Sequence, residues 1–151
     1  MPEGSARRPA ILVSACLLGV ACNHEAKSSP SAAVRRLAEG FSLTPVCPEV
    51  LGGLPTPRPA AEVQPDGTVV NGRGDDVTDA YRRGAAAAVE LARAVGAERA
   101  VLKARSPSCG CHEIYDGTFT RTRVAGEGVT ARALRQAGLR VESEEDVARA
   151  P

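Results

Sequence analysis

Four short apolar runs, each followed by small or turn-prone residues, stand out along this chain. Runs of this length, rich in Val, Ile and Leu, are typical of buried strands. The predicted strands are Ala10 to Ser14, Ser42 to Val46, Arg99 to Lys103 and Leu139 to Val141.

Between the strands, apolar residues recur at steps of three and four, which predicts helices. The longest predicted helix begins at Asp76 or Thr78 and ends at Gly96, and its Gly84 to Ala88 stretch suits close packing against a sheet. The other predicted helices run from Ser31 to Glu39, from Val129 to Ala137, and from near Ser143 into the acidic C-terminus.

The remaining segments predict loops and one hairpin. Residues Ala15 to Pro30 and the proline-rich stretch from Cys47 to Pro59 predict irregular loops, because proline lacks an amide donor and restricts its neighbours. Ala61 to Val63 and Thr68 to Val70 flank an Asp-Gly turn and predict a hairpin beside the main sheet. Tyr115 to Phe119 predicts an extended region.

Strands that alternate with helices predict a single small α/β domain. We expect a mostly parallel sheet flanked by helices, in a Rossmann-like three-layer arrangement with a β-hairpin excursion. The chain of 151 residues fits one domain over residues 10–151, and residues 1–9 predict a flexible tail because they lack an apolar period. Right-handed crossovers would bring the carboxyl ends of the parallel strands to one edge.

Charge and composition exclude several classes of protein. A formal net charge of +1 argues against stable nucleic-acid binding. No run approaches the roughly 18 apolar residues of a membrane span. The segment from Arg7-Arg8 to Cys22 resembles a lipoprotein leader, but Gly19 and Ser14 interrupt it, so we expect a soluble, cytoplasmic protein without a membrane partner.

Five cysteines, with no CxxC pair, indicate reduced thiols and not a disulfide framework. Three of them, Cys16, Cys47 and Cys109, each follow a predicted strand. Ligands of open α/β sheets bind at the carboxyl ends of the strands, so we expect these three thiols to meet there.

Three thiolates can hold zinc or an iron–sulfur cluster, and the spacing leaves both open. A structural zinc ion needs a fourth ligand. Candidates for it are Cys22, Cys111, His24 and His112. A cluster held by three thiolates would instead keep one iron open to substrate as a Lewis acid. Cys22 and Cys111 would then be bystanders, and we expect Cys111, two residues after Cys109, to lie nearer the site than Cys22.

Other polar residues near these cysteines are candidates for catalysis or substrate binding. Glu49 lies two residues after Cys47 and is a candidate general acid or base. Ser106 and Ser108 precede Cys109 and are candidates to orient a substrate or to move a proton. The candidate anion-binding side chains of a substrate pocket are Arg58, Lys103 and Arg105.

Three long motifs around the cysteines resemble the bacterial 2-thiouracil desulfidase family. They are Val13-Ser14-Ala15-Cys16-Leu17-Leu18-Gly19, the segment from Pro45 to Arg58, and the segment from Leu102 to Gly110. The match covers nearly everything after Pro9. The chain departs from the family pattern at Asn23-His24-Glu25, where the family often has a Tyr-Asp-Gly-like segment, so the wall of the substrate pocket is expected to differ.

The resemblance implies a [4Fe-4S] cluster bound by Cys16, Cys47 and Cys109, with one iron that has no protein ligand. It also implies that Glu49 and Ser106 serve proton transfer and catalysis. In the family, the sulfur of a thiocarbonyl passes to the cluster as a transient extra sulfide, water replaces it on the carbon, and hydrogen sulfide leaves without net redox change.

We therefore expect an oxygen-sensitive, iron–sulfur-dependent desulfidase that cleaves a C–S bond by hydrolysis. Its expected substrate is a small thiolated pyrimidine, such as 2-thiouracil, or a related thioamide. Two alternatives stay open from the sequence. One is a non-catalytic zinc or iron–sulfur binding module, and the other is a thiol redox protein that uses Cys109 and Cys111.

Overall fold

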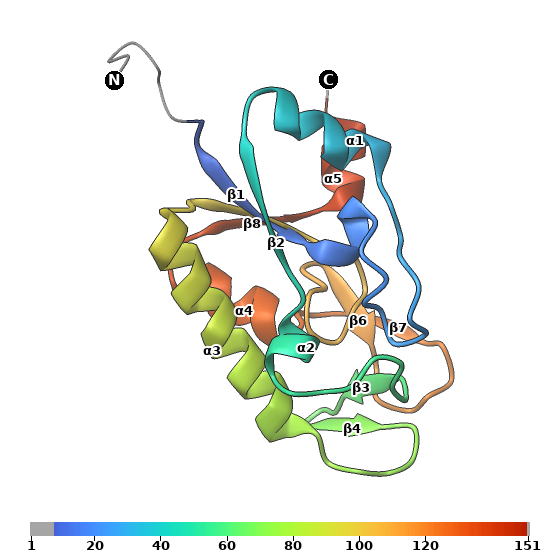
Figure 1. Cartoon of the computed structure of the whole chain (residues 1–151). Helices are drawn as coiled ribbons and strands as arrows, with labels where there is room; N and C mark the ends of the chain where they lie inside the picture. The colour runs from blue at the N-terminus through green and yellow to red at the C-terminus, as the bar shows by residue number, and fades with distance from the viewer. Residues whose placement is uncertain (1–7, 151) are drawn as a thin grey trace.

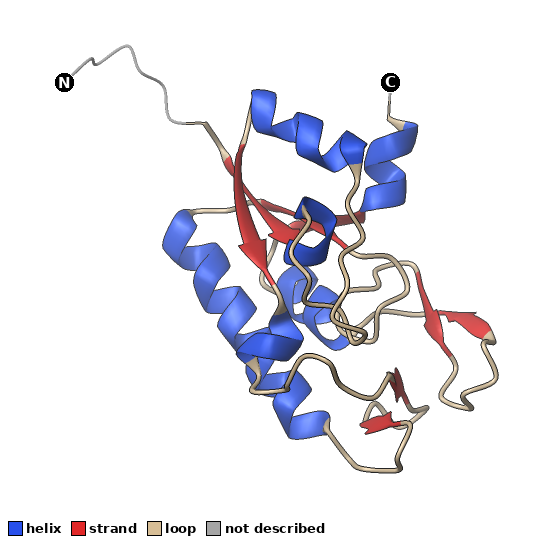
Figure 2. Ribbon diagram, turned by 45° about the vertical axis from the view of Figure 1, so that its right-hand side comes forward, coloured by secondary structure: helices blue, strands red, loops and turns tan. Residues whose placement is uncertain are grey.

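A central sheet of four parallel strands organises the structure, a computed structural model that describes residues 8–150. The strand order is β2-β1-β5-β8 (Figures 1 and 2). All three neighbouring pairs are parallel, as predicted. The strands are β1 (Ala10–Ser14), β2 (Ser42–Val46), β5 (Arg99–Leu102) and β8 (Arg140–Ser143).

Helices cover both faces of this sheet. α3 (Thr78–Val95) and α4 (Val129–Gln136) lie on one face, and α1 (Ala32–Arg36) and α5 (Glu144–Arg149) lie on the other (Figure 1). A 3-10 turn, η2 (Leu37–Glu39), continues α1. All four helices were predicted, and the three layers confirm the predicted α/β fold.

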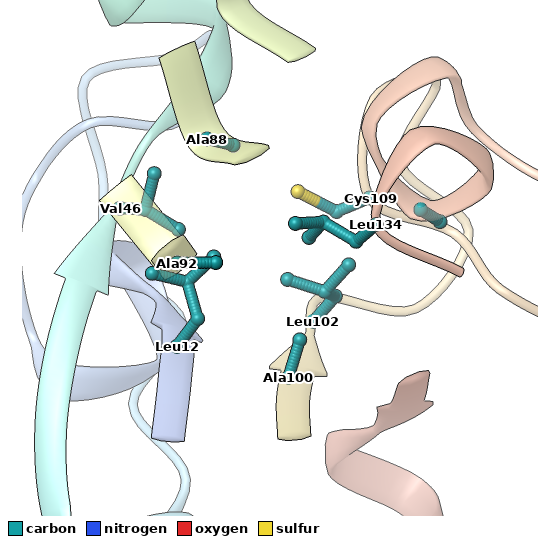
Figure 3. Packing of buried hydrophobic residues seen from close by; sticks show 9 residues of the cluster. Leu12, Val46, Ala88, Ala92, Ala100, Leu102, Cys109 and Leu134 are labelled. Atoms are coloured by element: carbon teal, nitrogen blue, oxygen red, sulfur yellow. The ribbon is translucent and has the colours of Figure 1, made fainter. Parts of the chain in front are cut away.

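The core is divided between the two faces because successive strand residues point to opposite sides. Leu12, Ala100 and Leu102 point toward α3 and α4, where Ala88 and Ala92 of α3 pack against them (Figure 3). The small alanine side chains let α3 lie close to the sheet. The strand residues that face α1 and α5 are Ile11, Val13 and Val101.

Two segments that were predicted to be irregular contain helical turns. η1 (Ala15–Leu18) is a 3-10 turn directly after β1, and α2 (Pro48–Leu51) begins directly after β2. The backbone N–H groups in the first turn of a helix have no acceptor within the helix, so a proline there loses no hydrogen bond. Pro48 stands at this position and is compatible with the start of α2. The prediction of a wholly irregular loop after Cys47 is therefore wrong.

Glycines bring the backbones of α2 and α3 into direct contact. A Cβ atom on Gly84 would lie 1.9 Å from the carbonyl oxygen of Pro48, and one on Gly52 would lie 1.9 Å from that of Ala80. No other residue fits at such distances. Gly84 was expected to pack against the sheet, but it packs against α2 and so fixes that short helix beside α3.

Two hairpins lie outside the central sheet (Figure 2). β3 (Ala61–Val63) and β4 (Val69–Asn71) form the predicted excursion. β6 (Glu113–Tyr115) and β7 (Arg123–Ala125) form a second antiparallel pair. The sequence predicted only an extended region there, because all three residues of β7 are exposed and show no apolar alternation.

The predicted tail of residues 1–9 falls largely outside the described residues, which begin at position 8. The carbonyl of Pro9 accepts a hydrogen bond from the backbone N–H of Ser42, which extends the β1–β2 pairing. None of the described helices has the length and apolar character that crossing a membrane requires.

Candidate active site

A cavity of about 680 Å³ opens where the strands of the sheet end. The segments that follow β1, β2 and β5 contribute Cys16, Cys47 and Cys109 to its wall. The sulfur of Cys109 points away from its own loop, toward the side where Val46 ends β2 (Figure 3). The structure thus brings together the three cysteines that the sequence singled out.

Two of these thiols are strongly shielded from water. Burial raises the pKa of Cys16 to about 11, although the positive charge of Lys103 opposes the shift. Burial also raises the pKa of Cys109 to about 12, against a hydrogen bond with Ser14 that lowers it. Without a cation in the cavity both side chains are neutral thiols at neutral pH. A bound metal would replace their protons.

The spacing of these thiols bears on the choice between zinc and a cluster. Among residues 8–150, the group of three potential ligands whose atoms lie within 4.8 Å of one another is Cys111, His112 and Asp146. The three cavity cysteines do not form such a group. A single zinc ion holds its ligands at about 2.0–2.3 Å. The wider arrangement therefore fits a larger group, such as an iron–sulfur cluster.

The candidate fourth ligands divide into two pairs. Cys22 and His24 line the cavity, whereas Cys111 and His112 do not, so the expectation that Cys111 lies nearer the site than Cys22 is wrong. The Cys47 thiol donates to the carbonyl oxygen of Cys22 at 3.6 Å, and burial raises the pKa of Cys22 to about 12.

All five cysteines are free thiols, which bears on the alternative of a thiol redox protein. Only one thiol of the alternative redox pair, that of Cys109, lines the cavity.

Glu49 has one carboxylate oxygen fixed and one open. The Tyr81 hydroxyl and the Arg58 Nε both donate to Oε2, at 3.0 and 2.9 Å. Oε1 has no hydrogen-bond donor among the described residues. Every buried side-chain oxygen of these residues has a partner, so Oε1 is not buried and is accessible. Glu49 lines the cavity and its side chain is 14% exposed. We conclude that Oε1 faces the cavity.

Arg58 lines the cavity wall, but its guanidinium is not free to bind a substrate anion. Its side chain is only 4% exposed. Besides Glu49, it donates to the carbonyl oxygens of Pro55 and Cys22 and to the Thr56 hydroxyl. Burial opposes its charge, but Glu49 raises its pKa. The expected anion-binding role is corrected to that of a residue that fixes Glu49.

Tyr81 was missed as a site residue by the sequence analysis. The regular spacing of apolar positions identified it only as part of the buried face of α3. Burial raises its pKa, so its hydroxyl is a neutral donor to Glu49. A buried tyrosine needs a partner for its hydroxyl. That requirement was the available clue, but it could not say which residue the partner is.

Ser106 shapes the loop that carries Cys109. Its hydroxyl oxygen accepts hydrogen bonds from the backbone N–H groups of Ser108 and Cys109, at 3.1 and 3.0 Å. The N-terminal amides of α4 hold the same loop, since Thr130 and Ala131 donate to the Ser108 carbonyl. Ser106 lines the cavity, and its hydroxyl hydrogen stays available to donate into it.

The two other predicted pocket residues differ in position. Ser108 is fully buried, bonds the Thr130 hydroxyl at 2.8 Å and does not line the cavity, so it makes no substrate contact. It was placed in the pocket because it directly precedes Cys109, whereas its side chain turns toward Thr130 of α4. Lys103 does line the cavity, with its Nζ 3.1 Å from Glu144.

Three comparisons relate this chain to known proteins. Residues 11–146 match the model of the 2-thiouracil desulfurase family. A Bacillus subtilis (strain 168) protein called YbbK is 41% identical over 146 residues, which cover 91% of this chain and 97% of that protein. The solved structure of TudS, a [4Fe-4S]-dependent thiouracil desulfidase, is similar with a TM-score of 0.86 and 45% identity, over 93% of this chain and 94% of that one. This chain belongs to the 2-thiouracil desulfurase family.

Proposed function

We propose that this protein is a [4Fe-4S]-dependent desulfidase that removes sulfur from a thiolated pyrimidine such as 2-thiouracil, or from a related thioamide. Its family and its similarity to TudS support the activity and the cofactor. The observation that carries the proposal is the open oxygen of Glu49 in the same cavity as Cys16, Cys47 and Cys109.

The three cavity cysteines fit a cluster in number, chemistry and placement. Thiolates are the usual ligands of iron–sulfur clusters, and each thiol comes from a different strand end. An iron of the bound cluster without a protein ligand would supply a Lewis acid for the sulfur of the substrate.

In the proposed reaction, water oxygen replaces sulfur on the thiocarbonyl carbon. A C–O bond forms, the C–S bond breaks, and the sulfur leaves as hydrogen sulfide with the two protons of water. No electrons are gained or lost, so no external oxidant or reductant is needed.

The proton transfer is assigned to Glu49. Its Oε1 accepts a proton from the attacking water and returns it to the leaving sulfur. Arg58 and Tyr81 hold Oε2, which prevents the carboxylate from rotating away from the cavity. Ser106 donates its free hydroxyl hydrogen to a heteroatom of the substrate ring and thereby orients it.

The test is the release of sulfide under anaerobic conditions from a panel of thiouracils, thiouridines and thioamides. We expect Glu49→Gln to lower kcat by about 10²–10⁴-fold while the protein keeps its iron, because the amide cannot accept the proton. Glu90→Gln, on the exposed surface of α3, is the matched control and should keep full activity.

Two results would contradict the proposal. If the iron-loaded protein released no sulfide from any compound of the panel, the enzyme activity would be excluded for these substrates. If Glu49→Gln kept both its iron and full turnover, Glu49 would have no part in proton transfer.

A further inference from the structure

We propose that Cys111, His112 and Asp146 form a second metal site, which binds zinc and is separate from the cavity. Their ligand atoms lie within 4.8 Å of one another. None of the three residues lines the cavity. The site joins the segment directly after Cys109 to the start of α5.

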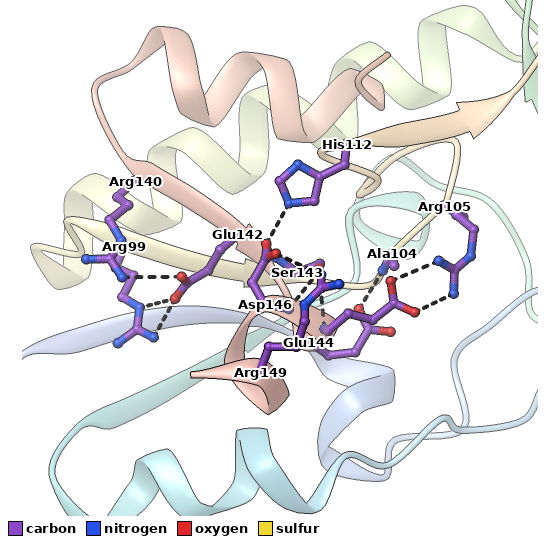
Figure 4. Close-up of polar contacts among 11 residues, drawn as sticks. Arg99, Ala104, Arg105, His112, Arg140, Glu142, Ser143, Glu144, Asp146 and Arg149 are labelled. Carbon is purple, nitrogen blue, oxygen red and sulfur yellow. Dashed lines mark hydrogen bonds and ion pairs between the residues drawn. The ribbon is translucent and has the colours of Figure 1, made fainter. Parts of the chain in front are cut away.

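The carboxylate of this site is already oriented. His112 Nε2 lies 2.6 Å from Asp146 Oδ2 (Figure 4). The backbone N–H of Ser143 donates to the same oxygen at 2.9 Å, as part of the capping box that begins α5. Backbone hydrogen bonds of this kind orient metal-binding carboxylates. The Asp146 carboxylate is therefore held at the site by the backbone of its own helix cap.

The other two ligands lie on a rigid turn. A Cβ atom on Gly110 would approach the carbonyl oxygens of Glu113 and Ser106 to 2.8 and 2.9 Å, so the backbone before Cys111 is tightly packed. The carbonyl of His112 accepts a hydrogen bond from Gly126 at 3.1 Å. The backbone that carries the thiol and the imidazole is therefore fixed on both sides of the turn.

The mixture of ligands favours zinc over magnesium and calcium. A thiolate, an imidazole and a carboxylate together suit Zn²⁺, whereas Mg²⁺ and Ca²⁺ prefer oxygen ligands alone. Three protein ligands leave the fourth tetrahedral position to water, which can reach the site because the His112 side chain is 58% exposed.

Binding would exchange protons for the ion without any redox step. Zn²⁺ displaces the thiol proton of Cys111 to solvent, and the ring proton of the neutral His112 moves from Nε2 to Nδ1, so that Nε2 binds the ion and Asp146 remains a carboxylate. Arg149, which bonds the other Asp146 oxygen at 3.3 Å, is 72% exposed and is free to turn into solvent. The bound ion would tie the Cys109 loop to α5 and raise the melting temperature of the protein.

The experiment uses protein that has been loaded anaerobically with iron and sulfide. It is incubated with zinc chloride and freed of unbound metal, and zinc and iron are counted separately. We expect one zinc per wild-type chain beyond the iron. Cys111→Ser and His112→Ala should lose that zinc and keep the iron. His24→Ala, which changes the other histidine of the chain, is the matched control and should keep the zinc.

X-ray absorption at the zinc edge adds a readout that does not depend on activity. We expect one sulfur neighbour at about 2.3 Å and nitrogen or oxygen neighbours at about 2.0–2.2 Å. Several sulfur neighbours would place the ion among the cavity cysteines and overturn the proposal. Wild-type protein that retains no zinc, or Cys111→Ser that retains as much as wild type, would also overturn it.

The zinc site and the proposed desulfidase function fail separately. Loss of sulfide release with one zinc still dependent on Cys111 would contradict only the enzyme activity. If the protein took up no iron, the cavity cysteines could also bind zinc, but the wild type should still retain one zinc more than Cys111→Ser.

Discussion

Two walls of the cavity each contain an arginine that bonds a glutamate, and the two ion pairs differ in how far they are exposed to water. In the buried wall, Arg58 bonds Glu49 with the help of Tyr81, and the two charged side chains are 4% and 14% exposed. In the loop wall, Arg105 bonds Glu145 through two hydrogen bonds at 2.9 and 3.0 Å, but these side chains are 26% and 46% exposed.

The difference lies in what replaces a lost partner. Water can solvate an exposed charge, so surface ion pairs contribute little to stability. A buried charge that loses its partner has no such replacement. We infer that the buried wall fixes the position and charge of Glu49, whereas the loop wall can adapt to the shape of a substrate.

The largest effect is expected in the buried wall. Arg58→Met should lower the free energy of unfolding by about 3–5 kcal/mol, because it leaves the Glu49 charge buried without its ion partner. Urea unfolding under anaerobic conditions measures this difference. A loss below about 1 kcal/mol would show that water reaches Glu49 as easily as it reaches the loop wall.

Tyr81→Phe tests the second contact of the buried wall. The loss of one hydrogen bond to a charged group should cost about 1.5–3 kcal/mol of unfolding free energy. Arg58 still holds the carboxylate in this variant, so the effect should be smaller than that of Arg58→Met. The pH profile of sulfide release should also change, since the surroundings of the Glu49 carboxylate change. An unaltered pH profile would show that Tyr81 contributes only to packing and not to the surroundings of the Glu49 carboxylate.

Ser106→Ala tests the loop that carries Cys109. The variant leaves the backbone N–H groups of Ser108 and Cys109 without their acceptor. We expect a loss of about 1 kcal/mol in urea unfolding, because water replaces part of these bonds. The rate of sulfide release should fall by more than this small loss of stability explains, because the substrate loses a hydrogen-bond donor. Equal activity to wild type would exclude Ser106 as a donor to the substrate.

The smallest effect is expected in the loop wall. Arg105→Met should change the free energy of unfolding by less than about 1 kcal/mol, and the difference should shrink further at high salt. The measurement is the same urea titration at low and high ionic strength. A loss as large as that of Arg58→Met would remove the distinction between the two walls.

Much of the fold could be predicted because the sequence patterns are local. The sheet strands and the four helices on its faces follow from apolar periodicity, and the alternation of the two implies a parallel sheet. α2 was missed because prolines were interpreted as breaking regular structure, although Pro48 stands where a helix tolerates it. The β6–β7 hairpin was missed because β7 buries no side chain.

The site could be predicted only in part. The place where the cysteines meet could be predicted, because the carboxyl ends of parallel strands lie at one edge of the sheet and each cysteine follows such an end. The direction of individual side chains could not be predicted. Ser108 turns toward Thr130, and Arg58 donates its hydrogen bonds to Glu49 and to nearby carbonyls. Tyr81 bonds Glu49 because tertiary packing brings α2 and α3 together.

The decisive measurement is the number of irons and sulfides per chain after anaerobic reconstitution of wild-type protein and of single Cys→Ser variants. We predict about four of each in wild type and in the control Cys111→Ser. Losses are predicted for Cys16→Ser, Cys47→Ser and Cys109→Ser. Stoichiometric zinc without iron uptake in wild type, or a full complement of iron in Cys109→Ser, would contradict a cluster held by these three cysteines.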